Sequence, residues 1–80
     1  MSDTTREFPF RYIPAEKRPL LIVASGVDIT TALREAADLE DAVRRLLAIG
    51  METGIDGGLA YLCEFALEIA GALRKSTGEG

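Results

Sequence analysis

The chain has 80 residues, of which 48% are apolar and 28% charged, with a net charge of −4, one cysteine and no histidine or tryptophan. This length accommodates one small domain and excludes a second. A single cysteine excludes an internal disulfide, and without histidine the chain lacks the ligands that zinc, copper or an iron–sulfur cluster requires. The composition therefore disfavours a site for these metals, and no sequence motif predicts a cofactor.

The acidic balance disfavours nucleic acids and anionic membranes as partners, because affinity for phosphate groups comes from clustered lysine and arginine. The N-terminus lacks the charged-then-apolar pattern of a signal peptide. The longest uncharged run, residues 19–27, is far shorter than the roughly 18 residues that suggest a membrane span. We therefore expect a cytoplasmic protein in which Cys63 is reduced.

Residues 1–18 are predicted to form a flexible N-terminal arm, of which 1–7 are polar and expected to be disordered. Residues 8–14 then alternate aromatic with other residues and include two prolines. Proline biases both itself and the preceding residue toward extended backbone. Phe8, Phe10 and Tyr12 are three of the five aromatic residues. We identify them as a candidate partner-binding arm, with the alternative that the arm covers the helices of its own chain.

The apolar, β-branched run 19–24 predicts a short strand that is buried on both faces. A lone strand leaves its backbone donors and acceptors without partners. Its partner is therefore either the extended segment 8–13 or the same strand of a second copy.

The spacing of apolar residues predicts a one-sided amphipathic helix over about residues 29–52. Asp28 precedes it and is suited to cap its N-terminus. Glu40 and Arg44 lie one turn apart in the favourable acid-first order, and we expect them to form an ion pair.

A glycine-rich turn leads to a second helix over about residues 58–76, with Asp56 as its N-cap. The short connection makes the two helices antiparallel neighbours. The second helix is apolar nearly all round, which is typical of a buried helix, and the first helix covers only one of its faces. We therefore predict a homodimer with a four-helix bundle core, whose interface is formed by Leu59, Leu62, Ala66, Ile69, Ala70 and Leu73.

These elements predict a mainly α fold. An extended N-terminal arm or short β-strand precedes an antiparallel helical hairpin, which dimerises into a four-helix bundle. The arm spans residues 1–18, the strand and helical hairpin form a domain over 19–76, and a disordered tail spans 77–80.

No group of residues predicts catalysis. Glu64 and Glu68 are the best pair of carboxylates, able in principle to share a proton or bind Mg²⁺ or Ca²⁺, but we interpret them as the solvent-exposed line of their helix. Cys63 lacks the basic neighbour at helical spacing that activates a thiol, and we expect a small buried hydrophobe. We assign no catalytic, cofactor-binding or metal-binding residue.

From residue 19 onward the pattern Pro-Leu-x-x-Val-x-x-Gly-Val, and later Ala60-Tyr61-Leu62-x-Glu64-x-Ala66-x-x-x-Ala70, resembles a family of short bacterial domains of unknown function. Ile22 stands where an aromatic residue is common in that family. The resemblance implies that an extended segment followed by a two-helix hairpin is a recurrent unit, and it supplies no activity and no catalytic residue.

We expect a non-enzymatic, homodimeric helical protein that acts through protein–protein interaction, as a small regulator, an antitoxin-like protein or an inhibitor. The alternative is a small-molecule binding module, since bundle helices can hold a ligand between them. The predicted lining of that pocket is Tyr61, Phe65, Leu47 and Met51.

Overall fold

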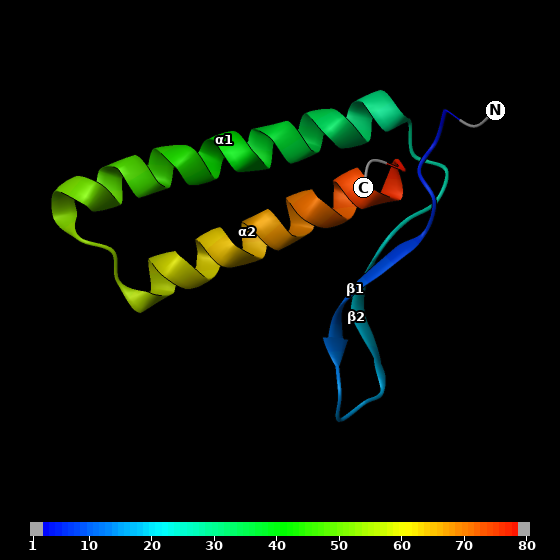
Figure 1. Ribbon diagram of the computed structural model, residues 1–80, viewed down its shortest axis with the longest axis horizontal. Coiled ribbons are helices and arrows are strands. Elements are labelled where there is room, and N and C mark those ends of the chain that lie inside the picture. Colours follow the sequence, from blue (N-terminus) through cyan, green and yellow to red (C-terminus); the bar gives the residue numbers. More distant parts are fainter. Residues whose placement is uncertain (1–2, 79–80) are drawn as a thin grey trace.

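The computed structural model describes residues 3–78, a range that excludes two residues of the predicted tail 77–80. A β-hairpin precedes a helical hairpin (Figure 1). The elements are β1 (Phe8–Ile13), β2 (Arg18–Val23), α1 (Ile29–Thr53) and α2 (Gly57–Ser76). The predicted helical hairpin is thus confirmed, and the ends of both helices fall within one residue of those expected from the sequence.

Local capping sets where the helices begin and end. The carboxylate of Asp28 accepts a hydrogen bond from the backbone N–H of Thr31 at 3.2 Å, and that of Asp56 accepts from Leu59 at 2.7 Å. Each bond satisfies one of the N–H groups that a helix start leaves without a partner. After α1 the chain turns at Gly54, whose φ of +93° favours glycine over other residues.

The two strands pair antiparallel, with Phe8 opposite Val23. The partner of the second strand is therefore segment 8–13 of the same chain, one of the two predicted alternatives. These residues form β1, and the prediction that they belong to a flexible arm is wrong. The expectation that the second strand is buried on both faces is wrong. Leu20 and Ile22 of β2 are 63% and 52% exposed, because nothing covers the outer side of this small sheet.

The expectation of disorder at the N-terminus is also wrong for the described part of residues 1–7. Thr5 is 3% exposed, and its hydroxyl donates to the carbonyl of Ala24 at 2.7 Å. The backbone N–H of Arg6 donates to the carbonyl of Ser76 at 2.7 Å. The N-terminal segment therefore ties the base of the β-hairpin to the end of α2.

α2 lies between α1 and the β-hairpin (Figure 1). Its buried residues fall into two groups, because an α-helix turns by about 100° per residue. Cys63 and Ala70 lie on the side toward α1, whereas Ala72 and Ser76 lie on the side toward the hairpin. The second face of α2, which the sequence left to another copy, is thus partly covered by the chain's own hairpin.

The elements form one layer. The molecule measures 47 × 34 × 16 Å, and an α-helix with its side chains is already about 10–12 Å across. Within the described chain no leucine, isoleucine, phenylalanine or methionine is fully buried. The buried apolar residues are all small: Ala32, Ala36, Val43, Cys63, Ala70 and Ala72.

Candidate functional site

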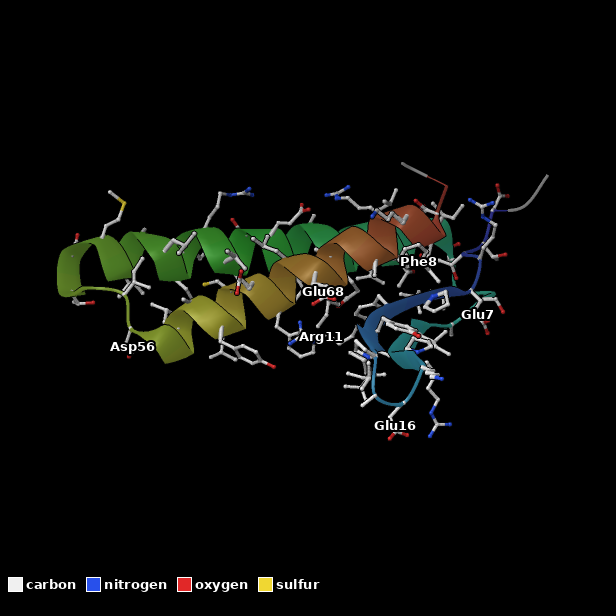
Figure 2. The ribbon with its side chains drawn as sticks, turned by 60° about the horizontal axis from the view of Figure 1, so that its bottom comes forward. Glu7, Phe8, Arg11, Glu16, Asp56 and Glu68 are labelled. Atoms are coloured by element: carbon white, nitrogen blue, oxygen red, sulfur yellow. The ribbon has the colours of Figure 1, made fainter. Side chains whose placement is uncertain are left out.

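The densest cluster of polar and aromatic contacts joins the β-hairpin to α2 at Arg11 (Figure 2). The guanidinium of Arg11 donates to the carboxylate of Glu68 and, at 3.0 Å, to the hydroxyl of Tyr61. Its central carbon lies 4.7 Å from the ring centroid of Phe65 and 5.6 Å from that of Tyr61. Arg11 therefore fastens the hairpin to α2 by an ion pair and by cation–π contacts with two rings.

The backbone conformation of Arg11 is unusual at this contact between the hairpin and α2. Its φ is +60°, in the left-handed region that non-glycine residues rarely adopt, and Arg11 has no paired residue on β2 although Phe10 and Tyr12 do. The hydrogen bond to the Glu68 carboxylate, together with its charge, raises the pKa of Arg11 above its ordinary value. The sequence analysis missed this residue. Its one signal was a charged side chain between two aromatic residues.

Glu64 and Glu68 do not form a joint carboxylate site. Glu68 pairs with Arg11, whereas Glu64 is exposed to solvent. No three His, Cys, Asp or Glu residues of the described chain are grouped so that they could hold a metal ion. Cys63 is 5% exposed and unpaired, as predicted for a small buried hydrophobe.

Glu40 has a different partner from the one expected. Its carboxylate accepts two hydrogen bonds from Arg74 of α2, at 2.6 and 3.0 Å, and Arg44 instead approaches Asp41 at 4.0 Å. The side chains of Glu40 and Arg74 are 29% and 35% exposed, against 73% for Arg44, so water competes less for the interhelical pair. The bonds from Arg74 lower the pKa of Glu40 below its ordinary value.

The predicted dimer interface residues do not share one environment. Ala70 is 1% exposed and is buried on the side toward α1, so it is unavailable to a second copy. Leu62 is 59% exposed. The other four predicted interface residues are half-buried: Leu59, Ala66, Ile69 and Leu73.

The candidate partner-binding arm is part of the hairpin. Phe8 and Phe10 are half-buried, and the ammonium group of Lys75 lies 5.8 Å from the Phe8 ring centroid. Tyr12 is 59% exposed. The exposed apolar side chains of β2, Leu20 and Ile22, join Tyr12 as hairpin residues that a partner can reach, and the sequence analysis had placed them in the interior.

The pocket predicted between the helices does not assemble. Tyr61 and Phe65 contact each other, with ring centroids 6.1 Å apart, and both lie under Arg11 on the hairpin side of α2. Leu47 and Met51 belong to α1 and are 37% and 86% exposed. The described residues enclose no pocket.

Comparisons with protein-family models, curated proteins and solved structures found no match. The resemblance to short bacterial domains of unknown function therefore stays a prediction. Neither described helix combines the length and the apolar character needed to cross a membrane.

Proposed function

We propose that this protein acts through protein–protein interaction as a homodimer whose helices form a four-helix bundle, and that it catalyses no reaction. The supporting observation is the contrast between small buried and large exposed apolar side chains. Burying one leucine, isoleucine or methionine side chain stabilises a folded protein by about 1.5–3 kcal/mol. The single chain obtains little of this stabilisation, because in the described part of the chain these side chains are not fully buried. Among residues 3–78, seven large apolar side chains are more than half exposed: Tyr12, Leu20, Ile22, Ile49, Met51, Tyr61 and Leu62.

These residues lie on two parts of the molecule, and we assign the two parts different partners. The helices carry the surface for self-association. The β-hairpin, on which the side chains of Tyr12, Leu20 and Ile22 are exposed, is assigned to a different protein, and Arg11 holds it in one position on α2. A small dimer that presents such a hairpin suits a regulator, an antitoxin-like protein or an inhibitor. Its unpaired Cys63 fits a reducing compartment such as the cytoplasm.

Sedimentation equilibrium of the full chain at micromolar concentrations tests the homodimer. We expect a mass of twice 8.6 kDa together with a helical circular dichroism spectrum. A chain that sediments as a monomer while its circular dichroism spectrum shows both helices folded contradicts the homodimer.

Site-specific photocrosslinking in the native cell tests the second partner. A benzoylphenylalanine replacing Tyr12 is expected to form a covalent adduct with one other protein. The same group replacing Arg34, on the polar side of α1, is the matched control and is expected to form none. The absence of any adduct from the hairpin, in cells where the dimer is present, contradicts this part of the proposal.

A further inference from the structure

The helical hairpin has two broad faces that differ in composition. One face carries the ion pair between Glu40 and Arg74 and the exposed side chains of Arg44 and Glu64. The exposed apolar residues of this face, Leu47, Met51 and Leu67, lie among these charges. The two partners of the ion pair lie on corresponding sides of their antiparallel helices, so the helical turn of 100° per residue assigns the remaining residues to one face or the other.

The opposite face, which we call the apolar face, is free of charged side chains in its centre. α1 and α2 each contribute three large residues to it, spaced by three, four or seven positions as one side of a helix requires. Leu46, Ile49 and Leu62 are 39%, 58% and 59% exposed, and the other three are half-buried. The apolar face consists of Leu39, Leu46, Ile49, Leu62, Ile69 and Leu73.

The apolar face is continuous along the hairpin. Because α1 and α2 are antiparallel, Ile49 near the end of α1 lies level with Leu62 near the start of α2, and Leu39 lies level with Leu73. The hydrogen bonds between Glu40 and Arg74 establish this alignment, because Glu40 follows Leu39 and Arg74 follows Leu73 in the sequence. Residues of both helices therefore fill one strip from end to end.

The surface area of the whole chain is large enough to supply an interface. The chain exposes 5670 Å². A compact monomer of 8.6 kDa is expected to expose about 4700 Å², so the surplus is about 1000 Å². A stable protein interface of standard size hides about 800 Å² on each partner. The radius of gyration, 14.4 Å against about 12 Å for a compact chain of this length, shows the same surplus.

We infer that the occupant of the apolar face is the apolar face of a second copy, related by a two-fold axis. This inference rests on the proposed homodimer and adds the surface that forms it. A domain is ordinarily built from at least two packed layers, and this chain of 16 Å thickness supplies one. The face has no charged centre, so a chain of net charge −4 can meet itself there without burying like charges.

Self-association then uses both helices. The sequence analysis had assigned the seam to α2 alone and had included Ala70, which is already buried within the chain. In the face-to-face arrangement, Leu46 and Ile49 of α1 are buried together with Leu62 of α2. Ala42 and Ala66 lie between the larger residues of the strip, and their small size allows close helix approach.

A pair of matched variants in the full chain tests the surface. Leu62 and Leu67 are both exposed residues of α2, at 59% and 47%, but Leu67 lies on the face of the Glu40–Arg74 ion pair. Leu62→Glu is expected to raise the dimer dissociation constant by about a hundredfold or more, because two carboxylates enter an apolar seam. Leu67→Glu is expected to leave it unchanged within about twofold, as is usual for exposed positions.

A labelling measurement covers the case in which Leu62→Glu fails to fold. In a Cys63→Ala background, Leu62→Cys is expected to react slowly with a maleimide when the protein is concentrated and faster as it is diluted. Leu67→Cys in the same background is expected to react quickly at every concentration. Sedimentation of both proteins shows whether they remain dimers.

The outcomes separate this inference from the proposed function. A wild-type chain that is a folded monomer overturns both. A dimer that Leu67→Glu dissociates and Leu62→Glu does not leaves the proposed homodimer standing and overturns the apolar face as its seam. Equal maleimide reactivity at positions 62 and 67, in proteins that sediment as dimers, likewise overturns the apolar face as the seam and leaves the homodimer standing.

Discussion

Glu40 of α1 and Arg74 of α2 face each other with two parallel hydrogen bonds, at 2.6 and 3.0 Å, across the helical hairpin. This bidentate geometry adds energy and geometric specificity to the attraction between a carboxylate and a guanidinium. The pair fixes the register of the two helices near the C-terminal end of α2. It also gives one face of the hairpin a polar character that the other face lacks.

The pair makes stability depend on pH in a defined direction. The bonds from Arg74 lower the pKa of Glu40 from its ordinary value of 4.5, so the unfolded chain takes up this proton at a higher pH than the folded one. The stabilisation is therefore fully present above the unfolded-state pKa and is lost as the pH falls through the lowered folded-state pKa.

We expect Glu40→Gln to melt at a lower temperature than wild type at neutral pH, with the difference shrinking as the pH falls below 4.5. Thermal unfolding followed by circular dichroism at fixed protein concentration measures this. Glu52→Gln, at an exposed position of the same helix outside the apolar face, is the control and should follow the wild-type curve. A Glu40→Gln difference that stays constant through the acid range would contradict the assignment.

Arg11 is expected to hold the β-hairpin on α2 through the planar shape of its guanidinium as well as its charge. Arg11→Lys keeps the charge but cannot bond Glu68 and Tyr61 together while stacking on Phe65. We therefore expect faster hydrogen exchange at the amides of β1 and β2 in Arg11→Lys, with the exchange of α1 little changed.

The left-handed backbone of Arg11 gives a second comparison. Arg11→Gly and Arg11→Ala both remove the long side chain, but only glycine adopts a φ of +60° without steric strain. The glycine variant should be the more stable of the two by thermal unfolding. An alanine variant that is equally stable would indicate that the positive φ is not maintained.

Thr5 is expected to be important for stability because of its hydroxyl group. The hydroxyl donates to the carbonyl of Ala24 at 2.7 Å and accepts from the N–H of Val27 at 3.1 Å. Thr5→Val keeps the shape and removes both bonds, which leaves two backbone groups without this partner at a site that is 3% exposed. We expect a loss of about 1–3 kcal/mol in the free energy of unfolding, measured by urea titration. Thr30→Val, at an exposed position, should cost less than half as much.

Local signals in the sequence predicted the helices well. Each N-cap bonds to a residue three positions along the chain, as Asp28 does to Thr31, so the sequence itself brings the two groups together. The pairing of β1 with β2 across a short turn is also local, although the sequence left it open against pairing with a second copy. Periodicity identified the apolar side of α1, although it could not show which parts of that side would remain exposed.

The contacts that position the candidate surfaces could not be predicted, because they join distant residues. Arg11 and Glu68 are 57 positions apart, and Glu40 and Arg74 are 34 apart. From the sequence, the partner expected for Glu40 was Arg44, which lies four positions further along the same helix. The sequence also showed that α2 is apolar nearly all round, but which side of α2 the β-hairpin covers depends on contacts between distant residues.

Two glycines inside the helices are expected to respond to alanine in opposite ways. A side chain at Gly71 of α2 would meet nothing within 4 Å, so Gly71→Ala should stabilise the protein by about 0.5–1 kcal/mol. At Gly50 of α1 the added carbon would lie 2.5 Å from a side-chain carbon of Ile55, so the Ile55 side chain must shift. Gly50→Ala should therefore gain nothing or lose stability in the same urea titration, and a gain equal to that of Gly71→Ala would contradict the close approach.

The 16 Å thickness of the chain has a consequence for the protein in a cell. If each copy completes the interior of the other, the folded fraction follows the law of mass action and rises with the amount of protein made. Newly synthesised chains below the dissociation constant would remain open to proteases, whereas those above it would be protected. Expression level would then set both the activity and the lifetime of this protein, with the dimerisation constant as the threshold.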